Sequence, residues 1–322
     1  MSKEYTYAVA RIRAIELGLL SKQDLETLIQ TRDYDEALSF LLDKGYGDDD
    51  RLKNAEEIIK RENEKTWELM KELVDDLNEL SIFTIPYDFH NLKVSIKAVT
   101  RDILPNSMFV NNGNIAPEVI YEAVKSRNMG TLPSYLSECG KEALTTLLQT
   151  SDGQLCDIII DKASLEELSK IGANSENEII RLYTEVAVAS ANIKMAVRCN
   201  KTNKSLEFIN KCLADCSTVN IDMLAKASVK SLEDIYNYLA HTNYSGAIEA
   251  LKKSPTEFEK WCDNLLMDKM KTQKWEPFTI GPLVAYIVAR DTEIKAVRII
   301  LSAKLNNLDT EIVKERLRDM YV

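Results

Sequence analysis

Three short segments of similar sequence recur along this 322-residue chain at a constant spacing. The triplets occupy residues 91–93 (Asn-Leu-Lys), 192–194 (Asn-Ile-Lys) and 293–295 (Glu-Ile-Lys), so each step is 101 residues long. A basic residue follows each triplet, and the third is displaced by one position: Lys97, Arg198 and Arg298. The spacing predicts three related domains of about 100 residues, with boundaries at residues 1–104, 105–205 and 206–322.

Helical periodicity covers most of the chain. Leu25, Leu28 and Ile29 form one apolar stripe, and a second stripe from 37 to 41 follows a break at residues 33–35, which predicts a helical hairpin. A longer charged helix is expected over residues 58–80. Only 10 Gly and 7 Pro are available for tight turns, which argues against strand-rich sandwiches and barrels. The predicted fold class is all-α.

The repeat is longer than the roughly 20 to 50 residues of solenoid repeats, so each unit has room for a small core of its own. Related units joined head to tail either close into a ring or continue as a helix. We therefore expect a three-lobed body with a pseudo-threefold axis and a central cavity. Leu92, Ile193 and Ile294 should then occupy equivalent buried positions.

The charge balance constrains the partners. The 51 acidic and 41 basic side chains give a formal net charge of −10, which argues against binding to a nucleic-acid backbone. Charged residues near the N-terminus and the short apolar run at 280–289 predict neither a targeting segment nor a membrane span, so a cytosolic chain is expected. The six cysteines lack a Cys-x-x-Cys pair and are interpreted as free thiols.

Residues suited to chemistry are few. His90 and His241 fall in different units, no phosphate-binding loop follows Gly45, and Cys212 with Cys216 offers at most half of a zinc site. Residues 75–79 (Asp-Asp-Leu-Asn-Glu) resemble the aspartate-rich helix of magnesium-dependent isoprenoid synthases, but no partner motif faces them. The solvated face of an amphipathic helix is the favoured interpretation. No catalytic, cofactor-binding or metal-binding residue is predicted.

Several segments together resemble a known family, the C subunits of the V/A-type rotary ATPases, which are equivalent to the d subunit of the eukaryotic vacuolar pump. The matching segments run in order along the whole chain: 5–20, 36–38, 45–47, 87–93, 132–136, Asp157 with Asp161, and 315–322. The length and the three helical units fit the same family.

The resemblance implies a funnel of three helical domains that lies peripherally on the cytoplasmic face of the membrane. Its base would sit on the rotor ring of proteolipid subunits, and its cavity would hold the central stalk. One copy per complex would couple ATP hydrolysis or synthesis to proton or sodium transport, without catalysis or a cofactor of its own.

Basic side chains in an otherwise acidic chain are candidates for contact with acidic surfaces of these partners. The candidates are Arg11, Arg13, Lys93, Lys97, Lys194, Arg198, Lys295 and Arg298. Basic residues beside an apolar stripe also simply solvate a helix edge, and Arg13 has Glu16 and Glu26 as possible internal partners.

The sequence is compatible with two other functions. The first is a freestanding helical scaffold or adaptor that binds soluble proteins. The second is a magnesium-dependent helical enzyme built on Asp75 and Asp76.

Overall fold

The computed structural model describes residues 5–47, 54–105 and 107–322, and within them the chain is helical and contains no strand. The predicted all-α class is confirmed. Among the helices of these segments, none combines the length and the apolar character needed to cross a membrane. The helices, in chain order, are α1 (Thr6–Glu16), α2 (Lys22–Gln30), α3 (Tyr34–Asp43), α4 (Ala55–Leu73), η1 (Leu77–Phe83), α5 (Ile85–Arg101), α6 (Pro117–Lys125), η2 (Met129–Thr131), α7 (Ser134–Thr150), α8 (Gly153–Asn174), α9 (Glu178–Lys201), α10 (Leu206–Cys212), α11 (Ile221–Lys230), α12 (Leu232–Leu239), η3 (Ser245–Ala247), α13 (Ile248–Lys253), α14 (Pro255–Thr272), η4 (Gln273–Trp275), α15 (Gly281–Leu305) and α16 (Thr310–Arg316).

The chain divides into two compact units. Residues 1–77 and 249–322 form the first, here called the terminal unit because it contains both chain ends. Residues 78–248 form the second, here called the middle unit. The three-domain boundaries expected from the repeat stay a prediction.

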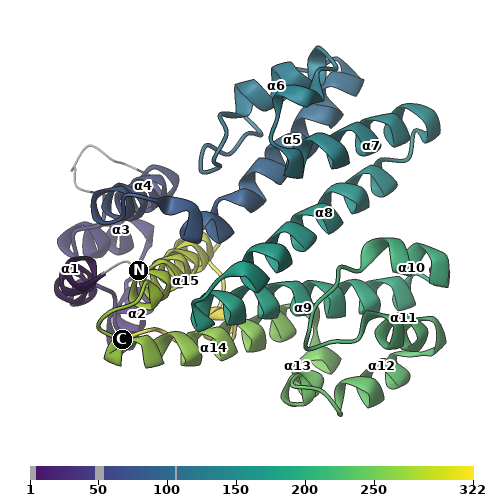
Figure 1. Ribbon diagram of the computed structural model, residues 1–322. Helices are drawn as coiled ribbons and strands as arrows, with labels where there is room; N and C mark the ends of the chain where they lie inside the picture. The colour runs from purple at the N-terminus through teal and green to yellow at the C-terminus, as the bar shows by residue number, and fades with distance from the viewer. Residues whose placement is uncertain (1–4, 48–53, 106) are drawn as a thin grey trace. The chain divides into compact units, whose positions relative to one another are not determined.

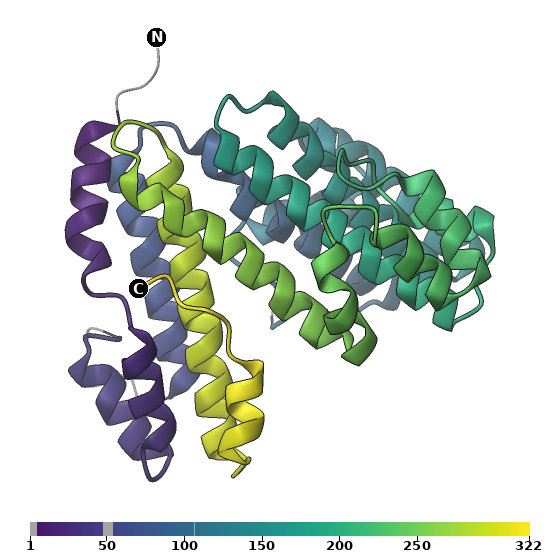
Figure 2. The same ribbon diagram turned by 90° about the horizontal axis from the view of Figure 1, so that it is seen from below.

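The terminal unit is built around α15. This helix begins at Gly281 with Pro282 in its first turn, where the missing amide hydrogen of proline costs no hydrogen bond. The helices α1, α2, α3, α4, α14 and α16 all pack against α15. Its C-terminal half shares a core with the α2–α3 hairpin, which includes Leu28, Leu41 and Ile300. Figure 2 shows α16, the yellow helix near the C-terminus, beside the end of α15.

The predicted hairpin is confirmed as α2 and α3. Ser21 caps α2 through a capping box with Asp24, and the Asp33 side chain accepts the amide hydrogen of Glu36 at the start of α3. The expected break at residues 33–35 is therefore a helix start.

The middle unit contains α5 to α12. In this unit α5 packs against α6, α7 and α8, and Figure 1 shows α5 to α7 grouped together. Their shared core includes Leu92, Ile120, Leu136 and Ile160. The same unit contains α9, which packs against α8, α10, α11 and α12.

The three triplets lie on α5, α9 and α15, and two consecutive helices pack against each of these three. The hairpin of α2 and α3 packs on α15, α6 and α7 pack on α5, and α11 and α12 pack on α9. Leu92, Ile193 and Ile294 are all buried, as the repeat predicted.

The prediction of one long helix over residues 58–80 is wrong at its C-terminal end. The helix α4 ends at Leu73, where Val74 adopts an extended conformation and is buried. Two aspartates follow directly, and carboxylates near a helix C-terminus are unfavourable because the negative end of the helix dipole repels them. Asp75 and Asp76 are exposed and precede the 3-10 helix η1, so they do not form a helical pair.

Candidate functional site

The first basic pair of the repeat is neutralised inside the middle unit. Lys97 on α5 forms an ion pair with Asp157 on α8 at 2.7 Å, and Lys93 pairs with Asp161 one turn further along. Both aspartates belong to segments that matched the family by sequence. These four side chains join α5 to α8, which gives Lys93 and Lys97 an internal role.

The other basic positions of the repeat differ in their surroundings. Lys194 is half-buried, whereas Arg198 and Lys295 are exposed. Arg298 lies 3.4 Å from Glu56 on α4, and both side chains are largely exposed. Their contact with partners stays a prediction.

The two N-terminal arginines also differ. Arg11 is exposed, and Arg13 pairs with Glu16 at 2.8 Å, one of the internal partners considered from the sequence. Arg13 also donates to the Gln273 carbonyl at 2.6 Å, and the Tyr321 hydroxyl donates to Glu16 at 3.1 Å. These contacts bind α1 to the start of η4 and to the C-terminal segment within the terminal unit.

The first residue of each triplet is a fully buried polar side chain. Asn91 donates to the carbonyl of Val110 at 2.8 Å and accepts its amide hydrogen at 3.0 Å. Asn192 makes the same two bonds with Ala214, at 2.7 and 3.0 Å. A carboxamide has one donor group and one acceptor, so it satisfies both backbone groups of one residue. Asn91 therefore clamps the loop that follows α5, and Asn192 clamps the segment that follows α10.

The third triplet begins with Glu293, which accepts the amide hydrogen of Leu20 and the hydroxyl hydrogen of Tyr46. A carboxylate only accepts, so it cannot satisfy a carbonyl as asparagine does. Its charge is instead balanced by Arg290, one turn earlier on α15. All three copies therefore fasten a loop through this position, but the third does so with different chemistry.

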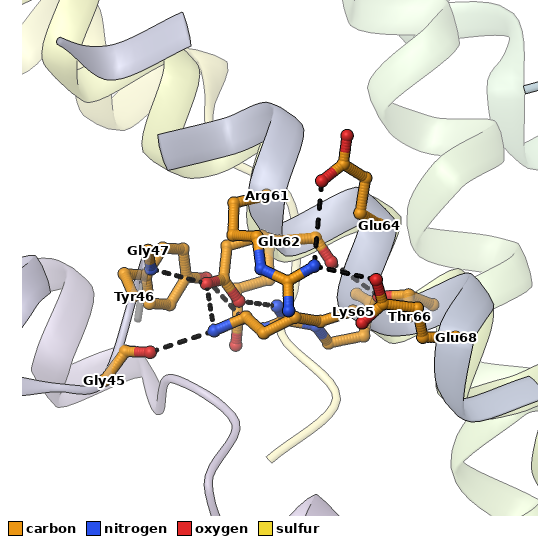
Figure 3. Close-up of polar contacts among 11 residues, drawn as sticks. Gly45, Tyr46, Gly47, Arg61, Glu62, Glu64, Lys65, Thr66 and Glu68 are labelled. Atoms are coloured by element: carbon orange, nitrogen blue, oxygen red, sulfur yellow. Dashed lines mark hydrogen bonds and ion pairs between the residues drawn. The ribbon is translucent and has the colours of Figure 1, made fainter. Parts of the chain in front are cut away.

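Arg290 lies between two buried carboxylates, Glu293 and Glu62 of α4. Figure 3 shows Glu62 surrounded by Tyr46, Gly47 and Lys65; Glu62 accepts the amide hydrogen of Gly47 at 2.8 Å and pairs with Lys65. Two carboxylates and two cations balance in this buried charge cluster, defined here as the buried Glu62, Arg290 and Glu293 with the partly exposed Lys65.

The directions of the pKa shifts in this cluster are consistent with a structural role. Burial raises the pKa of Glu293, and burial with the Glu293 charge raises the pKa of Tyr46 well above its ordinary value. Burial opposes the charge on Arg290, but Glu293, Tyr46, Tyr286 and Glu62 together outweigh burial and raise the pKa of Arg290. Tyr46 is thus a neutral donor and Arg290 a permanent cation. Removing either the carboxylates or the cations of this cluster would leave an unpaired buried ion.

Other sites considered from the sequence do not assemble. The helix α10 ends at Cys212, so Cys212 and Cys216 do not face each other across one helical turn. None of the six cysteines forms a disulfide within the described residues, as expected. Nowhere in residues 5–47, 54–105 or 107–322 do three or more His, Cys, Asp or Glu side chains gather closely enough to hold a metal ion.

A cleft of about 680 Å³ in the middle unit is lined mainly by α7 and α8. Its walls carry charges of both signs, including Glu142, Glu166, Lys162 and Lys170. Such a mixed surface does not select one sign of charged substrate.

Sequence reasoning missed the buried charge cluster, because Glu62 and Arg290 are distant in sequence. One signal was present. Arg290 follows directly on the most apolar run of the chain, 280–289, and a charge at such a position is buried only with a partner.

Comparison with known proteins gives a consistent result. A family model described as ATP synthase (C/AC39) subunit matches residues 8–316. The C subunit of the V-type sodium ATPase of Enterococcus hirae is 26% identical, and the alignment covers 99% of this chain and 99% of that protein. The C subunit of the A-type ATP synthase of Methanocaldococcus jannaschii is 25% identical over 97% of this chain and 86% of that protein. The corresponding protein of Desulfurococcus sp. (strain SY) is 23% identical over 97% of this chain and 90% of that protein.

Proposed function

Because this chain belongs to the ATP synthase (C/AC39) subunit family, we propose that it couples the central stalk of a rotary ATPase to the membrane rotor ring. Membership of the family makes the chain a non-catalytic subunit of a V/A-type ATPase complex. The observation that supports the assignment is the match over residues 8–316, which extends through both compact units.

In this proposal the chain transmits torque between ATP turnover in the head and proton or sodium transport in the membrane. It lies peripherally on the cytoplasmic face, in one copy, between the stalk subunits and the proteolipid ring. The funnel of three domains implied by the resemblance is part of the same proposal.

The physical properties of the chain suit such a role. A torque coupler must resist deformation, and packed helices with satisfied buried polar groups are stiff. Asn91, Asn192 and Glu293 fasten a loop to α5, α9 and α15 respectively, and the buried charge cluster joins α4 to α15. These contacts stabilise each long helix against its neighbours.

Co-purification tests the proposal. We would attach an affinity tag to the C-terminus of the chain, solubilise membranes in mild detergent and identify the proteins recovered with it. The coupling role predicts central stalk and proteolipid subunits in stoichiometric amounts. Recovery of soluble partners alone would support the scaffold alternative, and recovery of head subunits without stalk or ring would contradict the coupling role.

A further inference from the structure

A small apolar pocket lies on the terminal unit where α15 ends and α16 begins; we call it the α15–α16 pocket. It has a volume of about 190 Å³, and Ile299, Ala303, Leu308, Ile312 and Val313 supply its apolar lining. This volume is below the roughly 300–1,000 Å³ of small-molecule sites and suits one large apolar side chain. Leu308 and Ile312 are 47% and 45% exposed, so the pocket presents apolar surface to its surroundings.

Besides Ser302, two arginines line the α15–α16 pocket. They are Arg298 from α15 and Arg316 from α16. Lys295 is also exposed and precedes Arg298 by about one turn of the same helix. An apolar floor with a cationic rim is complementary to an apolar side chain flanked by carboxylates.

Carboxylates of the chain itself lie near this rim. Glu56 contacts Arg298 at 3.4 Å, and the two side chains are 75% and 53% exposed. An exposed pair of this kind contributes little and exchanges readily. On α16, Glu311 pairs with Lys314 at 2.8 Å. The rim arginines therefore remain accessible to carboxylates from a partner.

The chain contains its own example of this recognition chemistry. On α8, Asp157 and Asp161 are four residues apart and each follows an apolar residue, Cys156 and Ile160. The aspartates pair with Lys97 and Lys93 of α5, while the apolar residues enter the core beside that helix. A helix that carries two carboxylates four residues apart thus docks on a basic and apolar helix face within the middle unit.

We propose that the α15–α16 pocket docks an acidic amphipathic helix of another subunit of the complex. One large apolar side chain of that helix fills the pocket, and carboxylates three or four residues away pair with Arg298 and Arg316. This inference rests on the proposed function, since it places the partner within the rotary ATPase.

Photo-crosslinking in the assembled complex tests the docking site. Ile312 is replaced by benzoylphenylalanine, and Leu148 of α7, which is 54% exposed, is replaced in a matched control. We expect Ile312 to cross-link to a helical segment of another subunit that carries a large apolar residue between carboxylates, and Leu148 to miss that segment. Cross-links from Ile312 to lipid, to a second copy of this chain or to a segment without carboxylates would overturn the proposal.

Charge reversal gives an independent measurement. The Arg298→Glu, Arg316→Glu double variant should be retained on the complex about tenfold less well during dilution, because both rim contacts become repulsive. The control is Lys141→Glu with Lys226→Glu, two exposed lysines of the middle unit that give the same change of net charge. Circular dichroism verifies that both variants fold. Equal retention of the two variants would contradict the proposed pairing.

The outcomes separate this inference from the coupling role. Absence of the wild-type chain from the purified complex would overturn both. A complex that retains the chain but gives no cross-link from Ile312 to an acidic helix would overturn the docking site alone.

Discussion

At the scale of single residues, the structure depends on polar side chains that are buried at repeated positions. Asn91 and Asn192 each satisfy the amide and carbonyl of one loop residue, and no water is needed for either bond. A buried backbone group without a partner costs about 1–3 kcal/mol, so these side chains stabilise the loops more than their small size suggests.

Replacing Asn91 by Asp tests the clamp. The aspartate keeps the shape but cannot donate to the Val110 carbonyl, and its charge is buried. We expect Asn91→Asp to lower the free energy of unfolding by about 2–4 kcal/mol at neutral pH. Urea denaturation followed by circular dichroism measures the effect. Asn237→Asp, at an exposed position of α12, is the control, and an equal loss in both variants would contradict the clamp.

Asp291 predicts a pH dependence. Burial raises the pKa of this half-buried carboxyl from 3.8 to about 6. The folded chain therefore holds the proton more tightly than the unfolded chain, so this group lowers stability as the pH rises from about 4 to about 6. Asp291→Asn should raise the free energy of unfolding on the order of 2 kcal/mol at pH 8, and the gain should vanish near pH 4.

Thermal unfolding at several pH values measures this difference. Asp268→Asn, at an exposed position of α14, controls for the loss of one negative charge. A stabilisation by Asp291→Asn that is the same at pH 4 and pH 8 would contradict the buried-carboxyl explanation.

At the scale of helices, close packing depends on a few small residues. Gly172 in α8 lies against α9, where an added Cβ would come within 1.9 Å of the Thr184 hydroxyl oxygen. Thr184 is itself buried, so it has little room to move aside. This contact sets the distance between α8 and α9 near the end of α8.

We expect Gly172→Ala to lower the free energy of unfolding by about 1–3 kcal/mol, because the methyl group forces the two helices apart. Gly153→Ala is a matched control on the same helix, since a Cβ there meets no atom within 4 Å. The control should change stability by less than about 0.5 kcal/mol. Chemical denaturation of both variants compares them, and equal effects would rule out a close helix contact at Gly172.

The local sequence predicted the positions of the helices better than it predicted which helices pack against one another. The stripes of α2 and α3, the turn between them and the burial of Leu92, Ile193 and Ile294 follow from periodicity and spacing alone. The end of α4 at Leu73 depends on Val74 and on the two aspartates that follow it. The spacing of apolar residues alone does not predict this helix end. The packing of α2 and α3 on α15 joins the two ends of the chain, and no local pattern encodes such a contact.

The same difference applies to the basic residues proposed as partner contacts. The sequence flagged Lys93 and Lys97 as basic, but their ion pairs with Asp161 and Asp157 come from tertiary packing. Arg298 proved to lie on the rim of an apolar pocket, which sequence spacing alone does not reveal. Reversing Lys93, Lys194 and Lys295 together would therefore break an internal ion pair as well as any contact with a partner.

At the scale of the whole molecule, family membership makes the chain a non-catalytic subunit of the complex. The proposed coupling role then makes a quantitative claim about the complex. Under this proposal, ATP hydrolysis by the other subunits continues without this chain, whereas ion transport driven by hydrolysis requires it.

The most direct test is the number of ions transported per ATP hydrolysed in reconstituted vesicles, measured with and without this chain. We predict that complexes lacking the chain continue to hydrolyse ATP while transport falls to the passive leak, and that adding the purified chain restores transport. Full transport per ATP by complexes that lack the chain would contradict the coupling role.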